Sequence, residues 1–511
     1  MSSSAPDLPG NPQLSRDPAT LSAGLGFASQ PEGLRSLYFT ELWERFSYYG
    51  MRALLVLFMV APLADGGLAF SNTEAARVYG NYTMAVYMLA IPGGFIADRL
   101  IGARRAVAFG GWVIALGHYA LAIPMRATFY LGLVLIVLGT GLFKPNISAL
   151  VGALYHKSDP RRDAGFSLFY MGINIGAFVS PLVTGFLAQS ATFKAWLAQA
   201  GFDPAQSWHW GFAAAGVGMT LAMILFQRAA PTLRDPGADE PQGEDRDLFW
   251  RHAGWVLLGT VGLLALALAS DIEGLSWLRW TFLILPLAAI SYFVAKGGED
   301  NNRIAAIGVL FIAAMIFFAI FEQMGSSMSL FADQLTDNRI FGFEYPSSWF
   351  QSVNPIFVIL LAPMFAYLWL RLGRRQPSAP VKFATGLALV AASLFLMVPA
   401  AQLAGAGRVS PMWLAGLFFL QTCGELCLSP VGLSTMTRLA PAKLTGVVLG
   451  VWFLAAAFGN KLAGVLGGTF ESNDTGALSS FLWTQGLWVA LAAALLFALT
   501  PWVKRLSGET G

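Results

Sequence analysis

Apolar segments of about 18 to 25 residues recur along nearly the whole chain and are separated by short polar loops. A helix of that length crosses about 30 Å of hydrocarbon, so each segment is a candidate membrane span. The pattern predicts an all-α integral membrane protein with fourteen spans. They lie near residues 36–61, 78–97, 104–124, 128–152, 165–189, 209–229, 251–271, 277–296, 304–331, 347–371, 380–402, 411–435, 444–468 and 478–503.

The two halves of the chain follow one plan with an offset of about 270 residues. The loop GGFIADRLIGARR (93–105) follows the second span, and FAYLWLRLGRR (365–375) ends the corresponding span of the second half. Such repeats place a substrate path at the bundle interface near the membrane midplane. We therefore expect a cytoplasmic disordered tail (1–35), a six-helix bundle (36–229), a linker with a two-helix hairpin (230–303), a second six-helix bundle (304–503) and a cytoplasmic tail (504–511).

Composition supports a membrane protein and excludes other classes. Of 511 residues, 56% are hydrophobic and only 12% are charged, against roughly 25% charged in soluble domains. Most Lys and Arg fall on loops of one side if the N-terminus is cytoplasmic, which also places the C-terminus in the cytoplasm. The net charge of +3 therefore reflects topology, and no basic cluster with interleaved aromatics predicts nucleic-acid binding.

The first span carries ionisable groups where a membrane helix is normally apolar. At 100° per residue, one face about 100° wide holds Glu41, Glu44, Arg45, Tyr48 and Arg52. Charges at that depth are costly unless they meet partners, water or a mobile proton. We expect this stripe to line a wet cavity; the alternative is a buried structural salt bridge.

Few other charges lie within the predicted spans. They are Lys144, Glu322, Glu425 and Lys461, which with the first helix give four acids and four bases. A carboxylate among them can bind a proton in an apolar setting and release it when Arg45 or Arg52 approaches, which makes Glu41, Glu44 and Glu322 candidates for proton coupling. For Lys461 we expect only snorkelling toward the membrane surface. The sequence predicts no metal site, because Cys423 and Cys427 lack a surrounding His or Cys cluster.

The loop after the second span resembles the signature loop of the major facilitator superfamily. The matching residues are Asp98, Arg99, Arg104 and Arg105. The resemblance implies a gate that holds the cytoplasmic side closed; a positively charged loop obeying the topology rule is the alternative.

Several motifs together resemble the proton-dependent oligopeptide transporters, bacterial branch. These are ELWERFSYYGMRA (41–53), FYMGINIGAFVSP (169–181), FFAIFEQMGSS (317–327), QSVNPIFVILLAP (351–363), GELCLSP (424–430) and GVWFLAAAFGN (450–460). The resemblance implies a major facilitator fold with two extra helices, and import of di- and tripeptides with protons by alternating access. It further implies a monomer in the bacterial inner membrane that uses no cofactor besides the proton.

Roles carried over by motif position assign a substrate site. Arg45, Arg52 and Lys144 would face the peptide carboxylate, whereas Glu425, Asn174 and Asn354 would receive its amino group. Tyr48, Tyr49, Tyr87, Phe318, Ser429 and Trp452 would line the remaining surface, and Glu322 would pair with Arg52 as a proton-sensitive gate. Family members commonly carry Trp where this chain has Phe318, which puts the side-chain preference in doubt.

Two other functions remain open from the residues. A carrier for another zwitterion, an anion such as nitrate, or a drug would use the same fold, although the basic set together with Glu425 favours a zwitterion. An intramembrane hydrolase would need a nucleophile with a base; Ser429 lies four residues from Glu425, but no His accompanies them.

Overall fold

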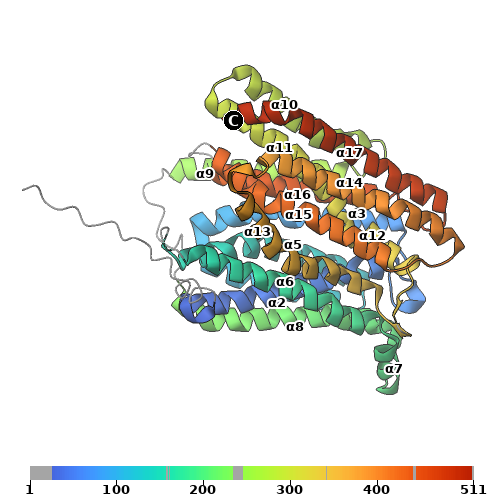
Figure 1. Cartoon of the computed structure of the whole chain (residues 1–511). Helices are drawn as coiled ribbons and strands as arrows, with labels where there is room; N and C mark the ends of the chain where they lie inside the picture. Colours follow the sequence, from blue (N-terminus) through green and yellow to red (C-terminus); the bar gives the residue numbers. More distant parts are fainter. Residues whose placement is uncertain are drawn as a thin grey trace, which may run out of the picture.

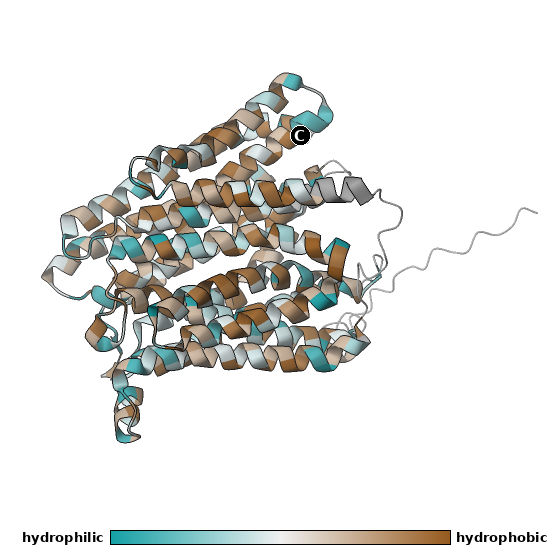
Figure 2. Cartoon of the chain, turned by 180° about the vertical axis from the view of Figure 1, so that it is seen from behind, coloured by the Kyte–Doolittle hydropathy of each residue, from teal (hydrophilic) through white to brown (hydrophobic). Residues whose placement is uncertain are grey.

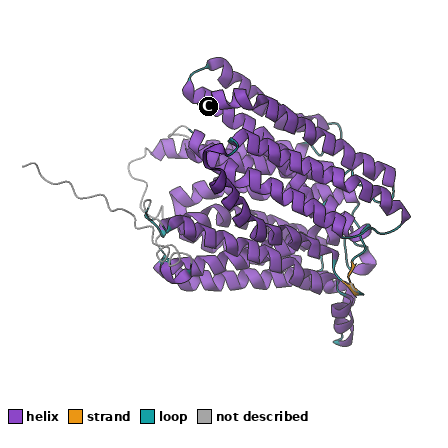
Figure 3. Ribbon diagram, in the orientation of Figure 1, coloured by secondary structure: helices purple, strands orange, loops and turns teal. Residues whose placement is uncertain are grey.

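The protein is almost entirely helical (Figure 3). The computed structural model describes residues 26–156, 159, 161–233, 246–340, 342–440 and 445–508. Most of the predicted tail at 1–35 and the polar part of the linker at 234–245 lie outside the described residues, as do Lys157 and the last three residues. The first long helix begins at Glu32, four residues before the predicted span.

The first half of the chain, here the N-half (residues 32–229), contains seven helices. They are α2 Glu32–Val60, α3 Asn72–Ile96, α4 Ala103–Leu121, α5 Arg126–Ala153, α6 Arg162–Gln189, the short α7 Ala191–Gln199 and α8 Ser207–Ala229. Within it, α2 packs against α6 and α8, and α5 packs against α3 and α4.

The linker helices α9 Arg246–Ala269 and α10 Thr281–Lys296 precede the second half, here the C-half (residues 299–506). Its helices are α11 Glu299–Phe321, α12 Ser327–Gln334, α13 Val353–Leu372, α14 Ala379–Leu403, α15 Met412–Leu439, α16 Thr445–Gly467 and α17 Thr475–Leu506. A small antiparallel pair, β1 Arg339–Ile340 with β2 Phe343–Glu344, follows α12, and Arg339 lies opposite Glu344.

The long helices run side by side, and both ends of the described chain lie at one end of the molecule (Figure 1). We call this end, where α2 begins and α17 finishes, the terminal face. The opposite end, which carries α7 and the β1–β2 pair, is the far face. Because successive long helices alternate in direction, α3 begins at the far face.

Apolar residues cover the outside of the helices as well as their contacts (Figure 2). Leu491 and Leu495 of α17 and Ile284 of α10 are exposed. Eleven of the described helices are long and apolar enough to cross a membrane. The helices α2, α4 and α9 are not among these eleven; in α2, charged residues interrupt the apolar sequence. The count of fourteen spans remains a prediction.

The two halves meet closely at the far face. There α3 packs against α16, α6 packs against α13, and α2 packs against α12. At the α3–α16 crossing a Cβ placed on Gly80 would lie 2.7 Å from the Cα of Gly464, so only glycine allows this approach. The linker helices pack on both halves, because α9 contacts α3 and α10 contacts α11.

The ninth predicted span, 304–331, is not one continuous helix. The helix α11 ends at Phe321, a 3₁₀ turn covers Glu322–Gly325, and α12 starts at Ser327. The break falls at Ser326, whose φ and ψ of −125° and −96° are not helical. The sequence marks this break only by the short polar run EQMGSS (322–327), whose residues are buried like the apolar ones around them.

Candidate functional site

The charged stripe predicted on the first span is buried inside the N-half. Arg45 is only 4% exposed and Glu44 is fully buried. The Nε of Arg45 lies 3.0 Å from Oε1 of Glu41 and donates a hydrogen bond to Glu44 Oε2. Glu41 Oε2, Glu44 Oε1 and Arg45 Nη2 are buried without a hydrogen-bond partner. The guanidinium of Arg45 thus pairs with two carboxylates. The three remaining polar atoms can still form hydrogen bonds with a proton donor, water or a ligand.

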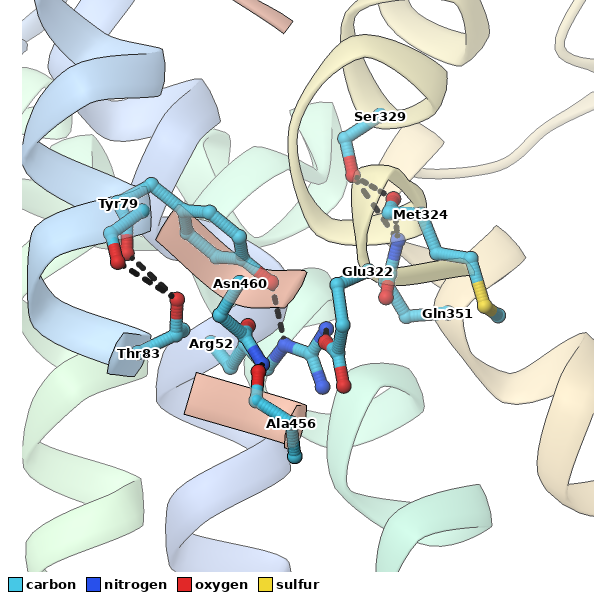
Figure 4. A network of polar contacts seen from close by, with 10 residues as sticks. Arg52, Tyr79, Thr83, Glu322, Met324, Ser329, Gln351, Ala456 and Asn460 are labelled. Carbon is cyan, nitrogen blue, oxygen red and sulfur yellow. Dashed lines mark hydrogen bonds and ion pairs between the residues drawn. The ribbon is translucent and has the colours of Figure 1, made fainter. Parts of the chain in front are cut away.

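Two turns further along α2, Arg52 joins the two halves of the chain (Figure 4). Its Nη2 lies 2.5 Å from Oε2 of Glu322, at the point where α11 ends, and its Nε donates to the hydroxyl of Tyr79 on α3 over 2.5 Å. This is the Arg52–Glu322 pair that the family resemblance predicted. Its role as a gate remains a prediction.

Tyr79 was not anticipated from the sequence. A signal was present, because Tyr79, Thr83 and the predicted Tyr87 follow one another at four-residue spacing on one face of α3. The turn at Glu322–Gly325 is shaped to receive Tyr79. A Cβ on Gly325 would lie 1.9 Å from its hydroxyl oxygen.

A side chain from the 3₁₀ turn Ser347–Ser352, just before α13, supports the same turn. Gln351 Nε2 donates to the Met324 carbonyl over 2.5 Å and lies 2.9 Å from Ser329 Oγ (Figure 4). The carboxylate of Glu322 is therefore held by the fold and is not carried on a flexible loop.

A second polar group lies in the C-half. The amide nitrogen of Asn354 on α13 donates to Glu425 Oε2 on α15 over 3.0 Å and to Thr422 Oγ1 over 2.9 Å. Asn354 and Glu425 thus lie together, and their predicted role in receiving an amino group stays a prediction. Asn174 on α6 instead donates to the Tyr170 carbonyl of its own helix over 3.0 Å, so its contact with a ligand stays a prediction.

Tyrosines of α2 and α3 lie close to these charged groups. Tyr49 is in electrostatic range of Arg45 and Arg52 on its own helix and of Glu322 and Glu425 in the C-half. The guanidinium of Arg45 lies 5.3 Å from the ring centre of Tyr48. Lys144 Nζ lies 3.9 Å from the ring centre of Tyr87, close enough for a cation–π contact.

A cavity of about 1020 Å³ extends from this region toward the terminal face. Four predicted residues line it: Tyr87, Phe318, Ser429 and Trp452. Phe318 and Trp452 meet edge to face, with ring centres 5.9 Å apart. The cavity reaches the terminal face at residues that include Gln376, Arg438 and Lys504.

The cavity wall also contains polar residues that the sequence did not single out. Tyr170 lines it from α6 and Lys382 from α14. Lys382 Nζ donates to Gln376 Oε1 over 2.9 Å and lies 4.2 Å from the ring centre of Trp369. Tyr87 lines the cavity and also packs against Lys144, so it connects the open space with the buried charges.

The loop that resembles the superfamily signature lies at the terminal face. The helix α3 continues as a π-helical turn, Ala97–Ile101, and Gly102 then adopts a φ of 81°, which glycine tolerates without strain. Arg104 donates to the Ala230 carbonyl over 3.0 Å, whereas Asp98, Arg99 and Arg105 are exposed. Their gating role remains a prediction.

The expectation that Lys461 snorkels to the surface was wrong. It is 2% exposed, and its Nζ lies 2.7 Å from Asp271 Oδ2. Asp271 follows the linker helix α9, so the partner comes from a segment that spacing on α16 could not identify.

The arrangement has the features of a transport site. Buried opposite charges from both halves lie beside a cavity that reaches one face, while the halves are in contact at the other face. The described residues contain no group of three His, Cys, Asp or Glu side chains placed to hold a metal ion. Fold and site together define an all-helical membrane transporter.

Comparison with known proteins gives the family. The model of the POT family matches residues 104–481. The chain is 38% identical to the peptide transporter YePEPT of Yersinia enterocolitica, over 95% of this chain and 97% of that one. It is 37% identical to a di-/tripeptide transporter of Lactococcus lactis, over 84% of this chain and 87% of that one. The chain belongs to the POT family, and it is a transporter and not an enzyme.

Solved structures agree with this assignment. A crystal structure of a peptide transporter POT in complex with sulfate has 37% identity and a TM-score of 0.80, covering 96% of this chain and 99% of that one. A POT family transporter in complex with 5-aminolevulinic acid has 29% identity and a TM-score of 0.79, covering 94% and 98%.

Proposed function

We propose that this protein is a proton-coupled symporter that imports di- and tripeptides by alternating access. One observation carries the proposal: the pair of Arg52 and Glu322 joins the two halves, and residues of both halves line a cavity that reaches the terminal face. Because this ion pair lies between the halves, protonation of Glu322 would change the contact between them. The peptide transporters to which the chain is similar support the choice of substrate.

The distribution of charge suits a zwitterionic peptide. Arg45 and Lys144 belong to the N-half, whereas Glu425 with Asn354 belongs to the C-half. The carboxylate of a peptide would meet the first set and its amino group the second. A cavity of about 1020 Å³ is large enough for a short peptide, since small-molecule pockets span about 300 to 1,000 Å³. Phe318 and Trp452 leave an apolar wall for side chains.

The proton acts by removing a charge. When Glu322 takes up a proton, its attraction for Arg52 falls, and Arg52 can turn to the peptide carboxylate. When Glu322 loses the proton, the Arg52–Glu322 pair forms again and closes the far face. Glu41 and Glu44 compete for Arg45 in the same way, so a proton on either one changes how Arg45 is held.

The membrane arrangement belongs to the same proposal. We place fourteen spans in a bacterial inner membrane, with two six-helix bundles and a two-helix hairpin between them, in a monomer. The positively charged loop at Arg99, Arg104 and Arg105 lies at the terminal face, and the rule of cytoplasmic positive charge assigns that face to the cytoplasm. The cavity is then open to the cytoplasm and the far face is periplasmic and closed.

The test is uptake of labelled dialanine into proteoliposomes that hold the purified full-length chain. We expect accumulation above the outside concentration when the outside is acidic and the inside negative, and collapse of that accumulation when a protonophore removes both gradients.

Vesicles without protein and vesicles with labelled nitrate serve as controls. Equilibration of dialanine that ignores both gradients would contradict symport. Gradient-driven uptake of nitrate but not of dialanine would indicate the anion carrier instead.

A further inference from the structure

Three polar side chains close a ring at the α3–α16 crossing, away from the transport site. Lys461 Nζ on α16 donates to Asn81 Oδ1 on α3 and to Asp271 Oδ2, each over 2.7 Å. Asn81 Nδ2 donates to the same Asp271 oxygen over 2.8 Å. Every member of the ring contacts the other two, and each comes from a different element: α3, α16 and the turn after α9.

The ionic part of the ring binds the linker to the C-half. Asp271 pairs with the buried Lys461, and in the next helix Phe282 of α10 packs on Phe458 of α16 with ring centres 4.8 Å apart. Removing one partner of a buried ion pair strongly destabilises the folded protein. We therefore expect Lys461 and Asp271 to remain paired when the far face opens. Asp271 and Phe282 thereby tie the linker segment to α16, while the body of α9 packs against α3.

The ring's link to the N-half carries no net charge. Within the ring it consists of Asn81 alone, which is neutral and supplies one donor and one acceptor. It lies one residue from Gly80, where α3 and α16 come closest. Separation of these helices would remove Asn81 from the ion pair but leave the pair itself intact.

Water can replace Asn81 when it leaves. A small cavity of about 210 Å³ adjoins the ring and is lined by residues that include Arg77, Asp271, Arg279 and Lys461. Water entering there can hydrate Lys461 and Asp271 after Asn81 withdraws, so opening does not leave unsatisfied charge in an apolar core.

We propose that Asn81, Asp271 and Lys461 form a clasp by which the α9–α10 hairpin holds the far face closed, and that release of Asn81 is a step in opening that face. The proposal rests on the alternating-access function above. It gives the linker helices a positioning role in transport: they hold an ion pair on α16 against which α3 closes.

The test uses a thiol that only an open far face exposes. Ser326 is fully buried beside Gly467 of α16, and its hydroxyl has no hydrogen-bond partner, so Ser326→Cys loses no contact. Cys423 and Cys427 are replaced by Ala in the background. The rate of labelling by a membrane-impermeant maleimide is measured on the full chain in nanodiscs, without peptide or gradient.

In this background Asn81→Leu removes both hydrogen bonds and leaves the ion pair. Loss of two hydrogen bonds to charged groups should raise the labelling rate roughly tenfold with little change in melting temperature. The matched control is Asn301→Leu, because Asn301 donates to the Gly297 carbonyl in the turn just before α11 and lies away from the ring. It should leave the labelling rate unchanged.

A second variant distinguishes loss of the clasp from a general loss of protein stability. Asp271 also lies 3.8 Å from Arg279, so the variant Asp271→Leu with Lys461→Met and Arg279→Met replaces all three charged groups by apolar ones. Such a replacement often preserves stability, yet it removes the groups that hold Asn81. It should label as fast as Asn81→Leu. Labelling at the original rate in either variant would overturn the clasp. Proton-driven uptake by the unaltered protein is judged separately, so failure of symport and failure of the clasp give different results.

Discussion

At the scale of single residues, Arg52 connects the two halves of the chain. Its guanidinium contacts Glu322 of the C-half and the hydroxyl of Tyr79 in the N-half. The charged pair was expected from the family motif, because both residues belong to it. Tyr79 and the 3₁₀ turn that fits around it came only from the structure, since a tyrosine on an apolar helix is ordinarily a packing residue.

Gly325 tests how closely that turn fits. In Gly325→Ala the new methyl group would clash with the Tyr79 hydroxyl, because no Cβ approaches an oxygen to 1.9 Å. We expect a loss of about 1 to 3 kcal/mol of stability and a fall in dialanine uptake, measured by thermal unfolding and by transport. Gly259→Ala in α9 is the control, because nothing lies within 4 Å of its Cβ position. Equal melting temperatures for the two variants would refute the fit.

Glu425 tests the substrate site. Glu425→Gln keeps the size of the side chain and one acceptor for Asn354, but it removes the negative charge for a peptide amino group. We expect the dissociation constant for dialanine to rise at least tenfold, because an ionic hydrogen bond is replaced by a neutral one. Binding is measured by competition with a labelled dipeptide. Unchanged affinity would show that the amino group binds elsewhere.

At the scale of elements, periodicity predicted which face of α2 carries the charges but not how they pair. Glu41, Glu44 and Arg45 contact one another along a single helix, so their grouping follows from helical geometry. The Lys461–Asp271 pair joins α16 to a turn 190 residues earlier in the chain. No local pattern encodes such a contact, and for that reason the snorkelling expectation failed.

The α3–α16 crossing should decide whether the far face opens. Gly80→Val would push Gly464 away, because a Cβ at residue 80 lies 2.7 Å from its Cα. We expect the equilibrium to move toward an open far face, seen as longer distances between spin labels at residues 74 and 469. Gly450→Val on the same α16 is the control, since the atoms nearest to a Cβ at this position, those of Ile91, lie 3.9 Å away. A distance distribution equal to that of the unaltered protein would contradict this view.

At the scale of the whole molecule, the sequence was sufficient for the class and the family. Long apolar segments and the motif ELWERFSYYG led to an all-helical membrane transporter, and the POT family match agrees. The direction in which the cavity opens could not be predicted. Alternating access gives one sequence two arrangements of the same helices, and the difference between them lies in contacts between the halves and not in the helices themselves.

The central claim is that the charged stripe on α2 makes peptide movement depend on a proton. The most direct test is to measure the internal pH of proteoliposomes with an enclosed fluorescent dye. Dialanine is added outside with no imposed pH gradient and with the membrane potential clamped. The unaltered protein should acidify the interior. Glu44→Gln should not, although it should still exchange labelled for unlabelled dialanine, because a neutral side chain cannot carry the proton while the binding groups remain. Acidification by Glu44→Gln equal to that of the unaltered protein, or dialanine entry without acidification in the unaltered protein, would contradict the account.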